Sequence, residues 1–447
     1  MAIEISQRNR NKEGADLKRA GEIKDPVHGY IYFTEVEKDI IDSSPFQRLH
    51  RIKQLAGAEL TYPGAIHTRF LHSIGTMHLS GALASHLYDL GYLTSDEVQK
   101  IRIAGLLHDI GHGPFSHVYE EILDKYRHIT HEDLSRWVIR ESEIGDILGK
   151  HGFSKEEIAD LAVGVLAKTE KNFLNQLVAG HFSPDIMDYL LRDSYYAGVG
   201  YGRVDVHRLI NSLDLVDNVI AADYSGAFGV LESFIMARIE MFNVVYFHRT
   251  VRAANVMISR AMDYANERLG LCAFKNVDDF LDLDDAGTFL AILSLKNATE
   301  KKLATAYDMA ERVRSRRLLK STFEVTVHRR DTFFSNLLNR ASIREQLEVE
   351  LADKAGVEPE YLVIDVPTVL SIPINPIERR RSDILVYKKR AGVKVAQRIT
   401  EISPLMASLA EFVDIIRVYA KPQDRESVTK VCEQVFGNEP PFRRISM

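Results

Sequence analysis

The sequence predicts a mainly α-helical protein with a small α+β region at its C-terminal end. Apolar residues recur at helical spacing through most of the first 330 residues, whereas short strand-like runs are concentrated after about residue 340. The chain has 447 residues, 45% of them apolar, which is enough for a sizeable core. We therefore expect a mobile polar tail over residues 1–22, a helical core over 23–330 and an α+β region over 331–447.

The predicted core begins with a turn and a short strand. Pro26 and Gly29 mark the turn, and residues 30–33 favour a strand. Helical spacing follows in a series of segments that end at Pro and Gly or begin at capping residues such as Thr94. The expected helices cover residues 35–43, 46–56, 68–90, 97–110, 115–126, 130–140, 155–168, 185–196, 207–214 and 229–269.

The C-terminal region combines both kinds of pattern. Residues 361–366, 383–387 and 415–419 are short β-prone apolar runs. Residues 403–412 and 424–436 have helical spacing instead. This mixture predicts the α+β region.

Charge and cysteine content exclude several classes of protein. Lys and Arg total 57 against 63 Asp and Glu, and this net charge of −6 argues against a dedicated nucleic-acid coat. The two cysteines, Cys272 and Cys432, are too few for a disulfide framework or a cysteine metal cluster. The polar start lacks a signal-peptide pattern, and no run of 18 apolar residues would span a membrane. We expect a cytoplasmic protein.

Nine of the 16 histidines lie between His67 and His131, where uniform spreading would place about two. His108 and Asp109 follow an apolar helical segment; such a pair by itself is more often a capped helix end. With His72 upstream and Asp185 downstream, it becomes a set of two imidazoles and two carboxylates. That donor set suits one divalent ion, which could be Mn, Fe, Mg, Ni or Zn. The pattern is typical of metal-assisted hydrolysis.

More histidines follow the His-Asp pair. His112 and His117 flank a turn that contains Gly and Pro, and His131-Glu132 begins the next predicted helix. Histidine can transfer protons and bind phosphate near neutral pH. The three histidines are therefore candidate catalytic residues, and Glu132 could orient His117 or a water molecule.

Taken together, these motifs resemble the HD-domain deoxynucleoside triphosphate triphosphohydrolases. The resemblance covers about residues 22–260, with the HD motif region at about 65–195. The matching segments are residues 25–29 (DPVHG), 46–49 (FQRL), 52–55 (IKQL), 63–65 (PGA), 69–73 (RFLHS), 104–117 (AGLLHDIGHGPFSH), 130–132 (THE) and the run that begins at Asp185.

The resemblance implies hydrolysis of a dNTP at the α-phosphorus, which yields a deoxynucleoside and triphosphate. It also implies a role for each matching residue. Metal ligands would be His72, His108, Asp109 and Asp185; His117 would be the general acid, with His112 and His131 near the phosphates and Glu132 in support; Arg69 would contact phosphate, and Gln54, Leu55, Tyr189 and Asp193 would surround the deoxyribose.

Some positions depart from the family pattern. Ile186 stands where a relative has a phosphate-binding lysine, and Ala254 stands where a histidine faces the base or sugar. Arg249 and Arg252 could supply the missing charge. The loss of the lysine favours an alternative in which the same metal site acts on a nucleoside monophosphate, a cyclic nucleotide or another phosphoester.

Family enzymes are often tetramers that nucleotides activate at an interface site. Asp42 matches a residue of that site, whereas His50 replaces an arginine. The resemblance therefore implies a homo-oligomer, a dimer or tetramer, with a nucleotide activator as a further hypothesis.

Two clusters of basic residues are more typical of a solvent-exposed surface. Their functional interpretation is contact with nucleotide phosphates or RNA. They motivate a third hypothesis, a nucleotide-responsive or RNA-binding regulator. The clusters are Arg312, Arg314, Arg316 and Arg317, and Arg379, Arg380 and Arg381.

Overall fold

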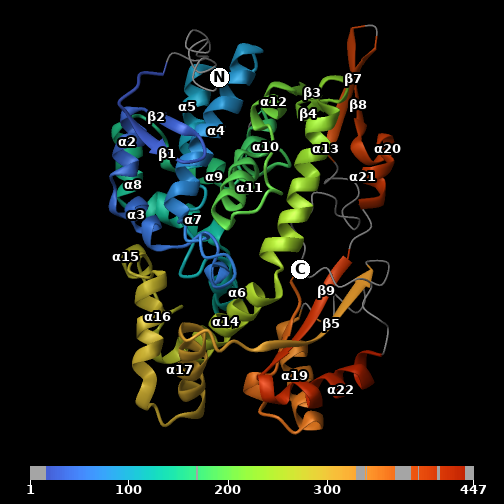
Figure 1. Ribbon diagram of the computed structural model, residues 1–447. Helices are drawn as coiled ribbons and strands as arrows, with labels where there is room; N and C mark the ends of the chain where they lie inside the picture. Colours follow the sequence, from blue (N-terminus) through green and yellow to red (C-terminus); the bar gives the residue numbers. More distant parts are fainter. Residues whose placement is uncertain are drawn as a thin grey trace.

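The computed structural model describes residues 17–167, 170–328, 338, 340–367, 384–390, 392–409 and 413–437 (Figure 1). Helices dominate the described chain, which confirms the mainly α fold class. The helices before residue 200 are α2 (Glu35–Ile41), α3 (Ser44–Gln47), α4 (Arg69–Asp89), α5 (Ser95–Leu107), α6 (His117–Arg127), α7 (His131–Glu141), α8 (Glu143–Lys150), α9 (Lys155–Ala162), α10 (Phe173–Ala179) and α11 (Pro184–Ala197).

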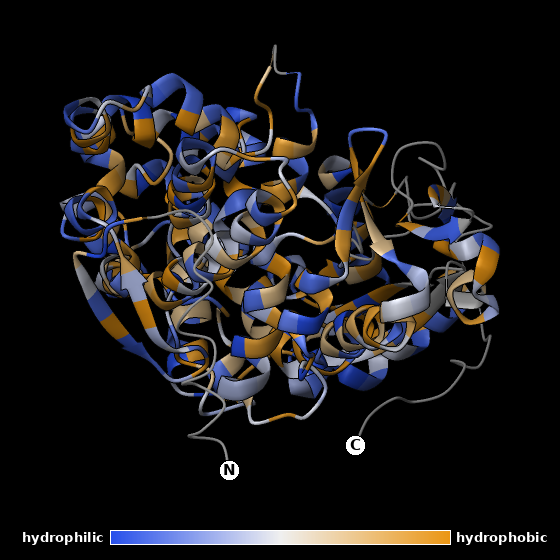
Figure 2. Cartoon of the chain, turned by 90° about the horizontal axis from the view of Figure 1, so that it is seen from above, coloured by the Kyte–Doolittle hydropathy of each residue, from blue (hydrophilic) through white to orange (hydrophobic). Residues whose placement is uncertain are grey.

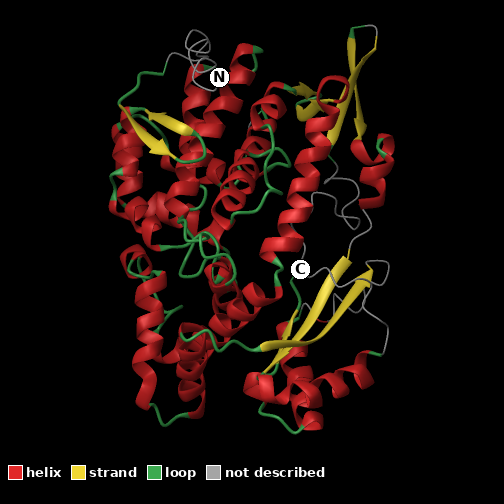
Figure 3. Cartoon of the chain, viewed as in Figure 1, coloured by secondary structure: helices red, strands yellow, loops and turns green. Residues whose placement is uncertain are grey.

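The remaining helices extend through the second half of the chain. These helices are α12 (Val206–Asn211), α13 (Tyr224–Met241), α14 (Arg249–Leu269), α15 (Val277–Leu281), α16 (Asp285–Leu293), α17 (Lys301–Arg314), α19 (Ala341–Ala355), α20 (Ile399–Ile402), α21 (Pro404–Leu409) and α22 (Arg425–Phe436). Figure 3 shows the strands in small groups beside these helices, of which α13, α14, α19, α20 and α22 contact strands.

Three small sheets accompany the helices. The first pairs β1 (Gly21–Asp25) with β2 (Gly29–Phe33), antiparallel, with Ile23 opposite Ile31. The second has the order β3-β4-β7-β8, built from β3 (Leu213–Val216), β4 (Val219–Asp223), β7 (Leu385–Arg390) and β8 (Val393–Arg398), and only β4 and β7 run parallel. The third is antiparallel, in the order β5-β9-β6, from β5 (Lys320–His328), β9 (Val413–Ala420) and β6 (Val363–Asp365).

Helix α4 lies at the centre of the N-terminal half, in contact with both α5 and α11. Fourteen of its 21 residues are buried, so apolar and small residues occupy nearly every face. Capping residues begin its neighbours: Thr94 forms a capping box with Glu97 at α5, and Ser183 caps α11, whose first residue is Pro184. These caps fix the helix starts next to the site described below.

Figure 2 colours many helices in alternating apolar and hydrophilic stretches, as amphipathic helices with one buried face require. The largest apolar cluster runs through α4, α5, α7 and α14, and a second one joins α19 and α22 to the sheet of β5, β9 and β6. Among the described residues, no helix combines the length and apolar content needed to cross a lipid bilayer.

Several predicted elements differ from the structure. The helix expected over 46–56 is only the short α3 followed by a 3-10 turn, Arg48–Arg51, and the helix expected over 155–168 stops at Ala162, two residues before Gly164 at φ +70°. The predicted helix 207–214 ends at Asn211, because Asp217 and Asn218 adopt positive φ angles and turn the chain into the β3–β4 hairpin.

The long helix expected over 229–269 is interrupted. Its first part, α13, begins at Tyr224 and continues into a π-helical turn, Phe242–Tyr246. The imidazole of His248 then accepts the backbone N–H of Thr250 and starts α14. Residues 1–16 of the predicted tail lie outside the described residues, but Gly21 and Glu22 already belong to β1.

Candidate active site

Three helices bring the four predicted metal ligands together. His72 lies on α4, His108 and Asp109 directly follow α5, and Asp185 lies on the first turn of α11. The Nε2 atom of His72 is 3.0 Å from Asp185 Oδ1, and the Nε2 atom of His108 is 3.4 Å from Asp109 Oδ1 and 3.6 Å from Asp185 Oδ1. Ligand atoms of His72, His108 and Asp109 all lie within 4.8 Å of one another. Their role as metal ligands stays a prediction.

Hydrogen bonds turn both imidazoles toward the centre of this group. The Nδ1 atom of His72 is 2.8 Å from Asp188 Oδ2, and the Nδ1 atom of His108 is 2.8 Å from the carbonyl oxygen of Gly105. Nδ1–H donation to these acceptors leaves Nε2 as the free ligand atom. Within the described chain, His108 Nε2 is buried without a hydrogen-bond partner, which is costly unless a cation uses its lone pair. The residues therefore fit a divalent ion.

Asp188 is a buried carboxylate that the sequence analysis did not single out. It accepts two hydrogen bonds from Arg192, at 2.8 and 2.9 Å, and lies 2.6 Å from His28 Nε2. Arg192 also donates to Asp25 at 2.8 Å, so the turn at residues 25–29 is attached to α11. A side chain on Gly75 would bring its Cβ within 1.9 Å of Asp188, so α4 and α11 approach closely only because this position is glycine.

Carboxylates set the electrostatics of the metal-ligand group. Burial raises the pKa of Asp109, but the charge of Arg69 and the neighbouring histidines holds it well below its usual range. Burial lowers the pKa of His72, yet hydrogen bonds with Asp185 and Asp188 raise it to about 10. His72 is therefore protonated at neutral pH, and a divalent ion bound at its Nε2 atom would take the place of that proton.

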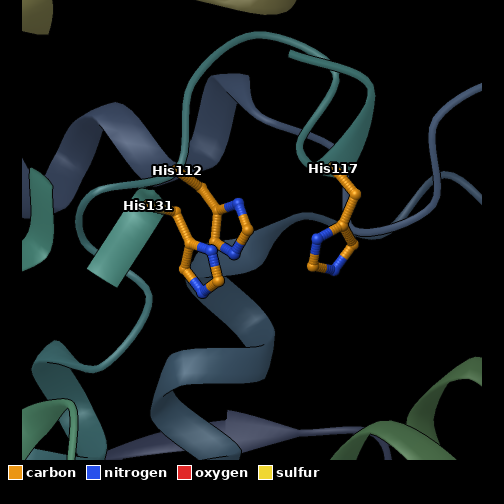
Figure 4. Close-up of side chains that lie close together, drawn as sticks. All are labelled: His112, His117 and His131. Carbon is orange, nitrogen blue, oxygen red and sulfur yellow. The ribbon is translucent and has the colours of Figure 1, made fainter. Parts of the chain in front are cut away.

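A second group consists of His112, His117 and His131 (Figure 4). The rings of His112 and His131 are stacked with centroids 4.0 Å apart, and that of His117 lies 5.0 Å from His112. The carboxylate of Glu120 bridges this group: it is 2.6 Å from His117 Nδ1 and contacts His131 Nδ1. Glu132, which we expected in this role, is instead exposed next to the helix cap.

The histidines of this group differ in protonation. Burial and the charge of Arg69 keep the pKa of His112 well below its ordinary value, so this imidazole is neutral. Burial also lowers the pKa of His131, but Glu120 raises it above the ordinary value overall. In turn, the hydrogen bonds from His117 and His131 lower the pKa of Glu120 despite its burial. The sequence signal that could have identified Glu120 as the partner of His117 is its position three residues after His117 on α6.

The predicted phosphate contact, Arg69, is almost fully buried. Its Nε donates to Ser116 Oγ at 2.7 Å and its Nη1 donates to Asp109. Within the described part of the chain, Nη2 is buried without a partner. The guanidinium therefore neutralises Asp109 first and has one donor group left.

The predicted sugar residues meet through a histidine. Asp193 lies 2.8 Å from His67 Nε2 and accepts the hydroxyl of Tyr246 at 2.6 Å. Tyr189 makes an edge-to-face contact with Tyr246, with ring centroids 6.2 Å apart. His67 was not among the residues predicted to surround the sugar, and Tyr246 was missed because 53 residues separate it from Asp193.

Gln54 and Leu55 are connected to His67 through the backbone. The backbone N–H of Gln54 donates to the carbonyl oxygen of His67 at 3.0 Å, while Leu55 packs against the apolar cluster of Ala58, Ala65 and Val251. Among the described residues, the side-chain oxygen of Gln54 is buried without a hydrogen-bond partner. This oxygen is a buried polar atom that a bound ligand could pair with.

The two replaced positions are apolar, and one of the two arginines that could compensate is paired with a carboxylate elsewhere. Ile186 is 7% exposed on the first turn of α11, next to Asp185. Arg252, a candidate substitute, forms two hydrogen bonds with Asp365 at 2.6 and 3.0 Å, so its charge is already used. Arg249 is exposed and Ala254 is fully buried.

The two residues matched to an activator site are close in the sequence. Asp42 directly follows α2, and His50 lies in the 3-10 turn Arg48–Arg51. Asp42 is exposed and forms an ion pair with Lys38 at 3.4 Å. His50 stacks on Phe70 with ring centroids 3.6 Å apart. No described contact joins Asp42 to His50.

Comparison with known proteins gives two family matches. A model of the HD domain matches residues 69–189, and a model of the HD associated region matches residues 204–444. The chain is 32% identical to the protein MJ1154 of Methanocaldococcus jannaschii over 87% of this chain and 75% of that protein. It is 30% identical to the deoxynucleoside triphosphate triphosphohydrolase SAMHD1 homolog of Dictyostelium discoideum, over 68% of this chain and 60% of that protein.

A solved structure is similar over nearly its whole length. The crystal structure of a hypothetical protein from Aquifex aeolicus, at 2.0 Å resolution, has a TM-score of 0.71 and 29% identity. The similarity covers 92% of this chain and 99% of that one.

Replacing Asp188 with Asn should weaken metal binding about 10- to 100-fold, because the amide no longer fixes the Nδ1–H form of His72. Metal titration against a competing chelator measures this affinity. Asp39→Asn is the matched control, since Asp39 also accepts from a histidine, His151 at 2.8 Å, that is not a candidate metal ligand. Equal affinities in the two variants would contradict the support role of Asp188.

Replacing Glu120 with Gln should lower the pKa of His131, because the carboxylate that favours the imidazolium is gone. Titration of the histidine Cε1–H signals by NMR follows this change. Glu132→Gln should lower the pKa of His131 less than Glu120→Gln does, because Glu132 raises it by charge alone and less strongly than Glu120. A similar shift in both variants would show that Glu120 is not the controlling carboxylate.

Proposed function

This chain belongs to the HD-domain family of metal-dependent phosphohydrolases, and we propose that it hydrolyses deoxynucleoside triphosphates to deoxynucleoside and triphosphate. The observation that carries the proposal is the adjacency of the two histidine groups. His112 Nε2 lies 3.3 Å from Asp109 Oδ1, so the metal-ligand group and the His117–Glu120–His131 group form one continuous site. A phosphorus atom bound at the first group would be next to proton donors of the second.

A divalent ion held by His72, His108, Asp109 and Asp185 would polarise the phosphate oxygens and supply an activated water. Glu120 raises the pKa of His131 and so favours its imidazolium form, which can stabilise a phosphate. His117 is the proposed general acid: its side chain is 71% exposed and its Nδ1 bonds to Glu120, which leaves Nε2 to give a proton to the leaving oxygen. Arg69 Nη2 is a further donor for the phosphates.

The preference for a deoxyribose is supported by the other side of the site. Asp193, Tyr246 and Gln54 offer polar atoms for a sugar hydroxyl. Leu55 and Tyr189 give apolar surface, where an unpaired 2′-hydroxyl would lose its hydrogen bonds to water. The name of the Dictyostelium discoideum relative, a deoxynucleoside triphosphate triphosphohydrolase homolog, agrees with this proposal.

Ile186 favours a second candidate, another phosphoester such as a nucleoside monophosphate or cyclic nucleotide. Its buried apolar side chain stands beside Asp185 where the family pattern has a lysine for the triphosphate. The RNA-binding hypothesis receives less support, because Arg312 bonds to Asp308 at 2.6 Å and Arg314 pairs with Glu311. The second basic cluster, residues 379–381, lies outside the described residues.

We also propose a cytoplasmic homo-oligomer, a dimer or tetramer, with a nucleotide activator. Light scattering with and without GTP or a dNTP tests the assembly and the activator together.

Incubation with each of the four dNTPs and four NTPs, in Mg or Mn, should release tripolyphosphate and deoxynucleoside from dNTPs only. Anion-exchange separation of the products measures this. Release of orthophosphate from a monophosphate, without turnover of any triphosphate, would support the second candidate instead.

Replacing His108 or Asp109 with Ala should abolish metal binding and turnover together, because each removes a metal ligand. Metal content and turnover are measured on the same preparations. His151→Ala, a histidine paired with Asp39 elsewhere, should retain both. Full turnover after both ligand changes would contradict the proposed function.

A further inference from the structure

Asp285, the first residue of α16, contacts two loops of the site described above. One carboxylate oxygen accepts the backbone N–H of Phe115 at 2.7 Å, and the other accepts the backbone N–H of Lys53 at 3.0 Å. Lys53 and Phe115 lie 232 and 170 residues away in the sequence, and Asp285 is only 7% exposed. Figure 1 shows α15 and α16 below α3, at the end of the N-terminal half that carries these loops.

The loop that Asp285 contacts has an unfavourable backbone. Phe115 and Ser116 both have positive φ angles, +59° and +56°, in a region that non-glycine residues rarely adopt. This loop carries His112 at one end and His117 at the other. Such a conformation persists only where its surroundings hold it in place.

Other bonds hold the same loop. Ser116 Oγ donates to the carbonyl oxygen of Lys53 at 2.9 Å. Buried Arg48 donates to the carbonyl oxygens of His112 and Leu283, both at 2.9 Å. Residues 283–285 therefore attach to the histidine loop directly through Asp285 and indirectly through Arg48.

The negative charge of Asp285 lowers the folding stability of the protein. Burial raises the pKa of Asp285 to about 6, although the N–H groups of Phe115 and Lys53 oppose the change. Since the folded pKa lies above the ordinary value, folding stability falls as pH rises from about 4 to 6, and the loss remains at neutral pH. A neutral acceptor would avoid this cost, but only a carboxylate accepts both N–H groups.

We propose that Asp285 is a positioning residue that holds the loop of His112 and His117 against residues 53–55. It thereby sets the separation between the general acid His117 and the sugar-facing Gln54 and Leu55. The inference rests on the proposed function, because it takes His117 as the proton donor. It assigns a role in catalysis to the HD-associated region, which contributes this side chain to the site of the HD domain.

Asp285→Asn tests the proposal, because an amide has one acceptor oxygen for two N–H donors and turns its own NH2 toward the second. The kcat for the preferred dNTP should fall about 10- to 100-fold while KM changes by less than about threefold. Misplaced catalytic groups slow the chemical step more than they weaken substrate binding. Metal content should not change. Hydrogen exchange should accelerate in peptides that cover residues 50–56 and 112–118, and not elsewhere.

Asp284→Asn is the matched control. Asp284 is the adjacent residue and caps α16 by accepting the N–H of Gly287 at 2.7 Å, a role that Asn can also fill. Its other carboxylate oxygen accepts from Arg51 at 2.7 Å, so exchange of residues 50–56 can change in this variant too. The kcat and the exchange of residues 112–118 should equal those of the unchanged protein. If Asp285→Asn shows no cooperative thermal unfolding, Asp285→Glu replaces it in both measurements, with a smaller loss of kcat expected.

The two measurements separate this inference from the proposed function. An unchanged kcat, or unchanged exchange in both peptides, would overturn the role of Asp285. A protein that turns over no triphosphate would overturn the proposed function. Faster hydrogen exchange in the two peptides of the Asp285→Asn variant would still show that Asp285 fixes both loops.

Discussion

The buried pair of Asp188 and Arg192 is the interaction on which the rest of the site depends. Both side chains are fully buried, and a buried carboxylate is stable only when every oxygen is bonded and its charge is matched. Arg192 matches the charge, and His28 and His72 complete the hydrogen bonds. These requirements join the N-terminal turn, α4 and α11 in one arrangement, and they orient His72 as a consequence.

A second consequence follows for the charge of the site. Asp188 is neutralised by Arg192 and Asp109 by Arg69, whereas Asp185 interacts with His72 and His108. Asp185 is therefore the carboxylate that faces imidazoles instead of an arginine, at the point where the four candidate ligands meet. A short distance away, the carboxylate of Glu120 contacts both His117 and His131. A cation-binding region and a proton-donating region therefore lie side by side.

The helical architecture followed from the sequence wherever local signals were strong. The apolar spacing of residues 68–90 and the cap at Thr94 located α4 within one residue and α5 within three residues at each end. The interruption near His248 and the β3–β4 hairpin were missed, because a long apolar stretch has helical spacing whether or not it is continuous. The Asp217-Asn218 turn was the local signal that could have revealed the hairpin.

The sequence by itself determined which residue types could form the site: His72, His108, Asp109 and Asp185, and the histidines that follow. Their identity and order are local properties of the chain. Only the tertiary structure decided which charges and hydrogen bonds those residues share. Asp188, Asp285 and Asp365 act on partners more than 100 residues away, and such pairings leave no periodic or spacing signal. Arg252 illustrates the difference. In the sequence it is a candidate to bind phosphate, but in the fold it is paired with Asp365.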